Sequence, residues 1–289
     1  MKDVVEEVDK VWHRQNYDLD IFPQLASEAL QNLSSLEIPK LNSMISEIAS
    51  LELPDQSFPD AVFSDLPITL ARTSKVHMDM YFWFKSDTSI HNHHFAGAFK
   101  VVKGSSYQIC YKFDSPISVD PSLYEGKIEK VSDNLLTEGS VELIIPEDCF
   151  IHQVIHLEKP TITLCLRTNS LPNLNLWGFV LPKYKILYTD FNQKQKKWYQ
   201  GLKNLHIHYP RLVPEFLSSM PICAGEAMRI VIQGNSGEGV LDPIHELILK
   251  SLTEKDYGID FYEMYQAQFK MTERLKKFGI ILKSQSMEK

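Results

Sequence analysis

Three histidines stand within four positions of one another in the stretch SIHNHHFAGAFKVVKG, at His91, His93 and His94. The stretch has the alternation of a strand, in which side chains at positions i and i+2 point to the same face. His91 and His93 would then present two imidazoles to one interior point, with His94 on the opposite face. Imidazole binds Fe, Zn, Cu and Ni, so the pattern predicts a metal site without choosing the metal.

A second histidine pair, His152 and His156, follows in the stretch PEDCFIHQVIHLEKP. The two are four positions apart, so they share a face if this segment is also a strand. One of them would complete a set of three imidazoles, and we expect this ligand to be His152. His156 would then lie beside the ligands as a catalytic or supporting group, or serve as the alternative third ligand.

The first of these runs resembles the first motif of the cupin superfamily, which reads roughly G-x5-H-x-H-x3,4-E-x6-G. His91 and His93 match its H-x-H, and Gly104 matches its closing glycine. Gly97 stands where the family usually has a Glu ligand. The resemblance implies a β-barrel of the cupin type, a double-stranded β-helix, over roughly residues 75–170.

The second run resembles the second cupin motif, which reads roughly G-x5-P-x-G-x2-H-x3-N. Gly139, Pro146 and His152 match it, with one extra residue between the first two. Asp148 replaces the middle glycine, and His156 takes the position of the Asn. The two motifs together are more specific than either one alone.

A three-His site that lacks the Glu is similar to the cysteine dioxygenase (thiol dioxygenase) group of cupins. The runs SIHNHH and FIHQVIHLEKPTITLCL resemble the corresponding runs of that group. The resemblance implies Fe(II) held by His91, His93 and His152, with a small-molecule thiol and O2 as substrates. That group has a His–Tyr pair after its last ligand, where this chain has Cys165 and Arg167. The broader expectation is an iron dioxygenase of the cupin type.

Two further residues are candidates for catalysis. Arg167 shares strand parity with Cys165, so it could face inward and bind a substrate carboxylate through two N–H groups. The alternative for Arg167 is a strand-end residue that faces solvent. Tyr107 lies on a neighbouring predicted strand and could donate a hydrogen bond to a ligand of the metal, although packing in a barrel is the commoner role of such aromatic residues.

The segments that must position these residues are predicted to be β-strands between about Ile68 and Val180. Six short runs rich in β-branched and aromatic residues suit a barrel or a two-sheet sandwich: MDMYFWFK, AGAFKVVKG, SSYQICYKF, SVELIIP, CFIHQVIHLE and TITLCLRT. The stretch from Asp114 to Asn134 is longer than a tight hairpin requires, and we expect a lid or an ordered excursion there.

Helical patterns flank this β region. Apolar residues recur at helical spacing near Val5–Trp12 and Leu41–Leu51, and again at Ile244–Leu252 and Met264–Phe278. The predicted fold is therefore α+β: a helical segment at 1–65, a cupin-type barrel at 66–185, and a helical region at 186–289. These helices would pack on the barrel or mediate a homodimer.

Composition excludes several classes of protein. The chain has 289 residues, 44% of them hydrophobic, and a formal net charge of −7. It has no cluster of Lys and Arg of the kind that binds nucleic acid, and no apolar run near the roughly 20 residues that span a membrane. The four cysteines are dispersed and the N-terminus lacks the pattern of a signal peptide, so we expect reduced thiols in a cytoplasmic protein.

Two other functions remain open from the sequence. One is a non-oxidative isomerase, hydrolase or lyase on the same fold, with Zn, Mn or Ni in place of iron. The other is a ligand-binding sensor without turnover, since one fold hosts many functions. A further H-x-H at His206 and His208 precedes a proline and is expected to lie at the surface.

Overall fold

The computed structural model describes residues 1–33, 53–56, 64–84, 87–187, 201, 204–205, 207–219, 259 and 277. The helical patterns predicted at 41–51, 244–252 and 264–278 lie outside these residues, as do His206 and Cys223. The predicted division at residues 65 and 185 stays a prediction.

Eleven strands are described, and they include all six runs predicted from the sequence. Their bounds are β1 Leu66–Arg72, β2 Val76–Trp83, β3 Ile90–His93, β4 Gly97–Lys103, β5 Ser106–Asp120, β6 Leu123–Leu136, β7 Val141–Ile144, β8 Glu147–His156, β9 Thr161–Thr168, β10 Trp177–Val180 and β11 Tyr184–Leu187. Glycines with positive φ, Gly104 (+83°) and Gly139 (+90°), lie in the turns before β5 and β7. These are two of the glycines that the motifs singled out, and a positive φ explains why glycine suits both turns.

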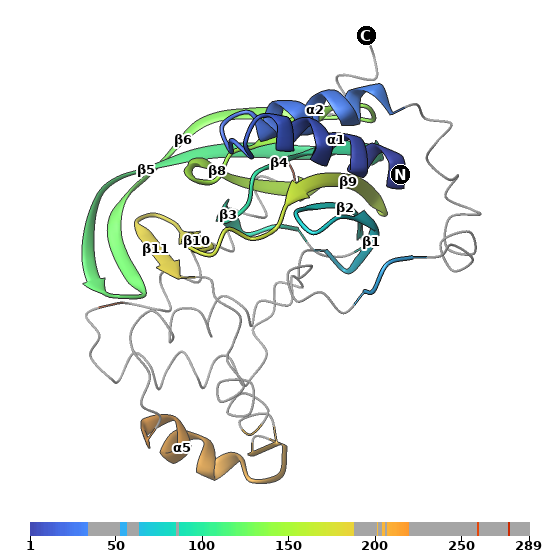
Figure 1. Ribbon diagram of the computed structural model, residues 1–289. Helices are drawn as coiled ribbons and strands as arrows, with labels where there is room; N and C mark the ends of the chain where they lie inside the picture. The colour runs from blue at the N-terminus through green and yellow to red at the C-terminus, as the bar shows by residue number, and fades with distance from the viewer. Residues whose placement is uncertain are drawn as a thin grey trace. The chain divides into compact units, whose positions relative to one another are not determined.

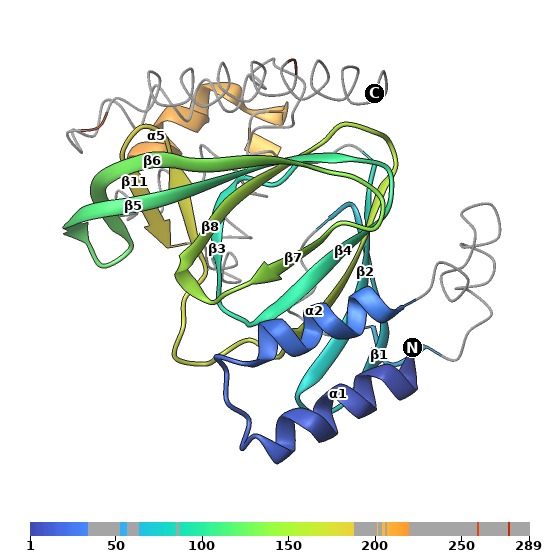
Figure 2. The same cartoon turned by 90° about the horizontal axis from the view of Figure 1, so that it is seen from above.

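The strands form two hydrogen-bonded layers (Figures 1 and 2). Five strands make a sheet in the order β1-β2-β9-β4-β7, and the other six are hydrogen-bonded as a closed barrel in the order β10-β11-β6-β5-β8-β3. The two layers mix strands from early and late in the chain, with β9 between β2 and β4, and with β8 between β5 and β3. Together with the N-terminal helices, this arrangement confirms the predicted cupin-type β-barrel.

Helices α1 (Lys2–Arg14) and α2 (Phe22–Asn32) cover the outer face of the five-stranded sheet (Figure 2). α1 buries Val5, Val8 and Trp12 on one side, as the spacing of the apolar residues predicted. The ammonium group of Lys100 on β4 donates hydrogen bonds of 2.9 Å to the carbonyl oxygens of Leu30 and Leu33 at the end of α2. This side chain therefore satisfies carbonyl groups that the helix end leaves without a partner.

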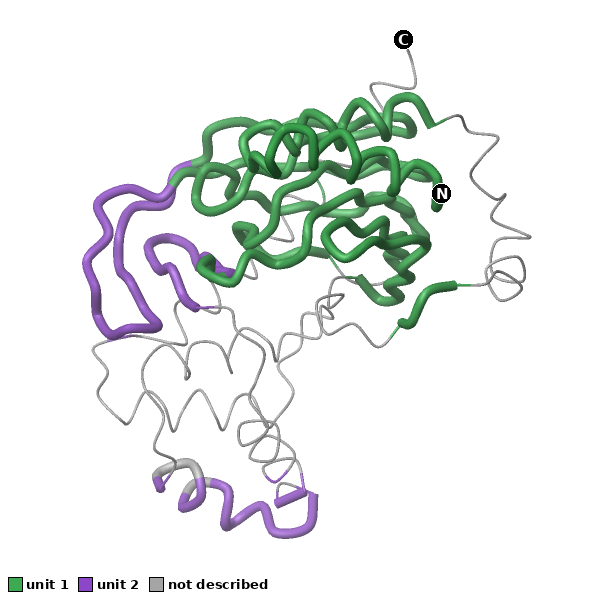
Figure 3. The backbone as a smooth tube through the Cα atoms, viewed as in Figure 1, with its two compact units in different colours: residues 1–112, 130–175, 276–289 green, residues 113–129, 176–275 purple. Residues whose placement is uncertain are grey.

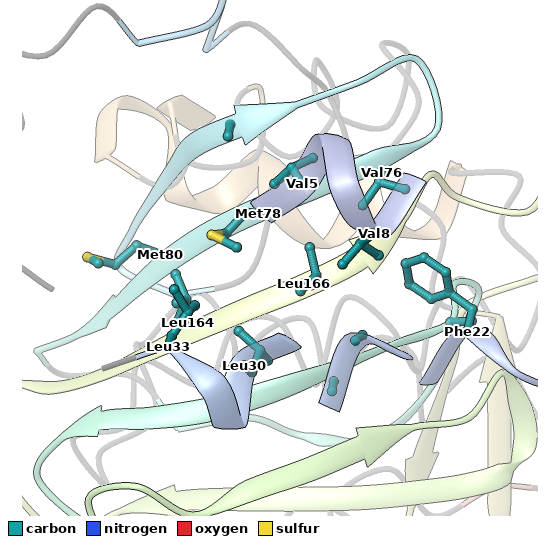
Figure 4. Close-up of a cluster of buried hydrophobic side chains, with 14 of the residues drawn as sticks. Val5, Val8, Phe22, Leu30, Leu33, Val76, Met78, Met80, Leu164 and Leu166 are labelled. Atoms are coloured by element: carbon teal, nitrogen blue, oxygen red, sulfur yellow. The ribbon is translucent and has the colours of Figure 1, made fainter. Parts of the chain in front are cut away.

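The central strands are buried on both faces, and their side chains alternate between two cores. The core under the helices takes Met78 and Met80 from β2 and Leu164 and Leu166 from β9 (Figure 4). Residues of opposite parity on the same strands, such as Tyr81 and Cys165, face a second core inside the barrel. Because a strand has a period of two, the helix-facing residues fix which residues face the barrel interior.

The stretch from 114 to 134, expected to be a lid or an ordered excursion, is an ordered continuation of two barrel strands. β5 runs to Asp120 and β6 begins at Leu123, so the two strands extend as a long hairpin with a short turn between them (Figure 1). Ile117, Val119 and Val131 on these extensions are exposed.

The chain divides into two compact units (Figure 3). The first contains residues 1–112, 130–175 and 276–289, and the second contains residues 113–129 and 176–275. In the second unit, β11 pairs with β6, and Lys185 lies over the rings of Trp177 and Phe179. A short helix, α5 (Val213–Ser219), also belongs to this unit. No helix among the described residues is long and apolar enough to cross a membrane.

Candidate metal centre

Three buried histidines meet at one point inside the first unit. One ring nitrogen of each of His91, His93 and His152 lies within 4.8 Å of those of the other two. The ring centroids are 4.8 Å apart for His91 and His93, 4.8 Å for His91 and His152, and 4.9 Å for His93 and His152. The three imidazoles therefore form a nearly equilateral triangle, and these are the three residues that the sequence predicted as ligands.

Strand pairing explains why two segments so far apart in sequence meet here. β3 and β8 are antiparallel neighbours, and His91 lies directly opposite His152 in their register. His93 is two positions further along β3, so its side chain emerges on the same face as that of His91. Residues opposite one another in an antiparallel ladder have Cβ atoms only about 5 Å apart, so the pairing brings His91 and His152 together. The register of the two strands then shifts between His91 and His93.

Hydrogen bonds fix two of the imidazole rings through their Nδ1 atoms. Nδ1 of His91 donates to the carbonyl oxygen of Ser89 at 2.8 Å. Nδ1 of His152 lies 3.0 Å from Oε1 of Gln108 on β5. Because both of these oxygens can only accept, the proton sits on Nδ1 and the lone pair of each ring is on Nε2.

The orientation of Gln108 is itself determined by a neighbour. Its amide nitrogen donates to Oε2 of Glu142 on β7 at 3.1 Å, and a carboxylate can accept but not donate this bond. The amide oxygen is therefore the atom that faces His152. A chain of contacts from Glu142 through Gln108 to His152 is the kind of outer support that orients the histidine ligands of metals.

Burial keeps the three imidazoles neutral. Removal from water lowers the pKa of His91 from an ordinary value of 6.5 to about 4. The same desolvation, followed by the neighbouring imidazoles, lowers the pKa of His93 and His152 well below the ordinary range. Neutral imidazole is the form that binds a metal, so these side chains fit a metal without first having to lose protons near pH 7.

The three histidines lie in the wall of a cavity with about 480 Å³ of empty space, part of it open to solvent. Most of the remaining wall is aromatic or aliphatic, and it comes from both layers of the barrel. The apolar and aromatic lining residues are Tyr81, Trp83, Phe95, Phe99, Ile144 and Val154, and the polar ones are Thr88, His156, Thr163 and Cys165. Phe95 and Phe99, which follow the His-x-His run, both line this space.

Gly97, at the position of the usual Glu ligand, is enclosed by the backbone of β9. It lies opposite Arg167 in the β4–β9 register. A Cβ atom at this position would lie 2.5 Å from the carbonyl oxygen of Leu166 and 3.0 Å from the Cα atom of Arg167. Since backbone atoms cannot move aside as a flexible side chain can, this close packing disfavours a carboxylate ligand at position 97.

The residues predicted to be catalytic have different surroundings. His156 lines the cavity, whereas Arg167 and Tyr107 are buried but are not among the described residues that line it. Nε of Arg167 forms an ion pair with Oδ2 of Asp79 at 2.8 Å, and its guanidinium lies 5.1 Å from the ring centre of Phe95. The solvent-facing alternative for Arg167 is therefore wrong, while a catalytic role for Arg167 or Tyr107 stays a prediction.

Tyr107 donates its hydroxyl hydrogen to Oδ2 of Asp133. Burial, followed by this bond and the nearby carboxylate, raises the pKa of Tyr107 above its ordinary range. Among the cysteines, Cys165 lines the cavity and Cys149 is exposed. His208, from the second H-x-H, is exposed.

Three supporting residues were not identified from the sequence: Asp79, Gln108 and Glu142. Asp79 and Gln108 are polar residues inside runs that otherwise read as buried strands, MDMYFWF and SYQICY. A buried polar residue must find a hydrogen-bond partner, so its presence in such a run is a detectable signal. The identity of the partner depends on strand pairing, which the runs alone do not specify.

Comparisons with known proteins assign neither a family nor an activity to this chain. No family model matches the chain, and no curated protein is significantly similar to it in sequence. Several solved structures resemble part of the chain, and three of them illustrate the similarity. A cupin superfamily protein from Desulfitobacterium hafniense DCB-2 is 15% identical over 41% of this chain and 95% of that chain, with a TM-score of 0.25.

A hydroquinone 1,2-dioxygenase from Sphingomonas sp. TTNP3 is 12% identical over 38% of this chain and 68% of that chain, with a TM-score of 0.29. A DMSP lyase structure is 15% identical over 38% of this chain, with a TM-score of 0.26. The matched part spans 50% of the length of the lyase chain. At these identities and TM-scores, none of the three assigns an activity to this chain.

The buried histidines predict how the stability of the metal-free protein depends on pH. The pKa of His91 in the folded chain, about 4, is lower than its ordinary value of 6.5. Between these values the unfolded chain binds protons that the folded chain does not. Stabilisation is therefore complete above about pH 6.5 and is lost as the pH falls toward about 4, by up to about 1.4 kcal/mol per pH unit for each such histidine.

Urea unfolding of chelator-treated protein at about pH 7.5 and about pH 5 measures this loss. The control is the triple variant H91Q/H93Q/H152Q, in which the acidic residues still titrate but these three imidazoles are absent. We expect a smaller pH dependence in the variant. Equal pH dependence in the two proteins would contradict the burial of neutral imidazoles.

Proposed function

We propose that this protein is a mononuclear non-heme iron enzyme of the cupin type, an oxygenase or dioxygenase that acts on a small molecule inside the barrel. The observation that carries the proposal is the triangle of buried, neutral imidazoles from His91, His93 and His152 at the wall of an apolar cavity. Two of the three rings have Nδ1 held by a fixed acceptor, which presents Nε2 as the donor atom to a metal.

Fe(II) held by these three side chains would supply O2 activation, because three protein ligands leave coordination positions for other molecules. The protein supplies the surroundings. The aromatic rings of Phe95 and Phe99 face the centre and reduce the access of water, and Phe150 lies against the ring of His93 with centroids 5.6 Å apart. An apolar wall of this kind controls solvent access and the local dielectric around a metal.

A buried network behind the cavity wall positions Tyr81. Its hydroxyl donates to Oδ2 of Asp79 at 3.2 Å, and Asp79 also accepts bonds from Arg167 and from the hydroxyl of Thr69. Burial, followed by the charge of Asp79, raises the pKa of Tyr81 well above its ordinary value, so the phenol is neutral. We infer that Arg167 compensates the charge of Asp79, so that the carboxylate can hold the phenol at the cavity wall.

A thiol is the first substrate class to test, because the two histidine motifs resemble those of the thiol dioxygenases. A second candidate function follows from the donor set itself. Three imidazoles without a carboxylate also form a catalytic zinc site, so a non-oxidative zinc enzyme fits the same residues. The two functions differ in whether turnover requires O2.

Nitric oxide, used in place of O2, tests whether the centre is open to a diatomic ligand. Protein reconstituted anaerobically with Fe(II) should give the half-integer-spin electron paramagnetic resonance signal of an iron–nitrosyl species. The variant His91→Ala should lose most of that signal. Stoichiometric iron without this signal would contradict an open iron site, and turnover in the absence of O2 with zinc bound would favour the non-oxidative enzyme.

The contact between Gln108 and His152 predicts a change in metal affinity. Gln108→Leu removes the acceptor that orients the ring, and loss of such a partner reduces metal affinity about 10- to 100-fold. Glu142→Gln is the matched control, because its amide oxygen can still accept the bond from Gln108. Competition with a chromophoric chelator measures both affinities, and an unchanged affinity in Gln108→Leu would show that the contact does not support the site.

A further inference from the structure

His156 is a polar group in the cavity wall that the metal centre does not use. It lies on β8 four residues after His152, which corresponds to about 13 Å along an extended strand. Its ring stacks on that of Trp83, with centroids 4.3 Å apart and an interplanar angle of 24°. Its backbone N–H donates to Oδ1 of Asp87 at 2.9 Å, so both the backbone and the ring are held in place.

The two ring nitrogens of His156 differ in their surroundings. Nδ1 lies 2.9 Å from the hydroxyl oxygen of Ser106. Nε2 is buried and has no hydrogen-bond partner among the described residues. A buried polar atom without a partner costs free energy, and such atoms are rare in folded proteins. This nitrogen therefore has unused hydrogen-bonding capacity on a side chain that lines the cavity.

The chemistry of His156 favours an uncharged partner. Desolvation lowers the pKa of His156 to about 3, so the ring is neutral near pH 7. The Ser106 hydroxyl can either donate to Nδ1 or accept from it, so Nε2 can accept or donate in turn. A hydroxyl or an amide of the bound molecule can hydrogen-bond to Nε2 in either tautomer of the neutral ring.

The wall of the cavity that contains His156 and the three histidines is largely apolar. Phe99, Ile144 and Val154 contribute to it, together with Trp83. An ionised group placed here would lose its hydration, which is costly unless a counter-charge is present. The guanidinium of Arg167 is already paired with Asp79.

Resting on the function proposed above, we propose that the cavity binds an elongated, uncharged small molecule whose head group meets the three-His centre and whose neutral polar tail hydrogen-bonds to Nε2 of His156. His156 is then a specificity-determining residue that selects the tail of the substrate, distinct from the residues that hold the metal. The proposed contact does not involve Arg167, whose guanidinium is paired with Asp79.

Four thiols that share a six-carbon chain and differ only in the tail test the proposal. They are mercaptohexanol, hexanethiol, mercaptohexanoate and aminohexanethiol. Each is titrated anaerobically into protein loaded with Co(II), and the thiolate-to-cobalt charge-transfer absorption reports binding of the head group. We expect mercaptohexanol to bind about five- to tenfold more tightly than hexanethiol, and more tightly than both charged thiols.

The variant His156→Phe keeps a ring that can stack on Trp83 and removes the nitrogen. The variant should lose the preference for the hydroxyl tail. Its affinity for hexanethiol should stay within about twofold of the affinity of the parent protein, because hexanethiol makes no hydrogen bond that the substitution removes. Ser106→Ala is the matched control, since it removes the partner of Nδ1 and leaves Nε2 in place, and it should keep the preference. Cobalt stoichiometry and circular dichroism show whether each variant is folded. Binding of the four thiols to the parent protein tests the tail preference without any substitution.

A charged tail that binds most tightly would overturn the proposal, as would a hydroxyl preference that survives in His156→Phe. Failure of the metal site is a separate outcome, seen as an absence of stoichiometric cobalt. In that case calorimetric titration of the metal-free protein with mercaptohexanol and hexanethiol still measures the tail contact. Equal binding of these two compounds would then overturn the proposal by itself.

Discussion

The antiparallel pairing of β3 with β8 is the constraint on which the rest of the site depends. It places His91 opposite His152. The side chains of His93 and His156, at even spacing along the same two strands, line the same cavity. A slip of one residue in this register would turn either strand over and move its imidazoles away from the cavity. The register is held by the surrounding sheet, because β8 is also paired with β5 from Ser106 to Tyr111. That second pairing brings Gln108 and Ser106 beside β8, where they contact His152 and His156.

Burial on both faces of the five-stranded sheet gives the cavity its chemical character. The helices α1 and α2 cover the outer face, so the helix-facing residues of β2 and β9 form one core and the alternate residues line or support the cavity (Figure 4). The few polar groups on the inner face are therefore removed from water and must be satisfied by each other. Asp79, Arg167, Tyr81 and Thr69 do this as one network. The imidazoles reach neutrality through the same desolvation, which prepares them to bind a metal.

Local patterns in the sequence were sufficient to predict much of this arrangement. The H-x-H spacing placed His91 and His93 on one face, and the β-rich runs became strands. Long-range contacts were not predictable from the same patterns. Arg167 could face either solvent or the interior, and only its register beside β2 and the partner Asp79 decide this. The segment 114–134 was expected to be a lid or an ordered excursion because it is longer than a tight hairpin requires. It extends two strands that hydrogen-bond to each other. The choice of His152 over His156 likewise depends on which of them lies opposite His91.

The metal content of the purified protein is the most direct test of metal binding by His91, His93 and His152. The protein would be purified without added metal and without oxygen, and elemental mass spectrometry would give the amount of each metal per chain. A metal centre held by His91, His93 and His152 predicts close to one iron per chain, with a large decrease in the variant His152→Ala but not in His156→Phe. Absence of any bound divalent metal, even after reconstitution with iron, zinc and manganese, would contradict a metal centre at these histidines. The remaining interpretation would be a barrel that binds its ligand without a metal.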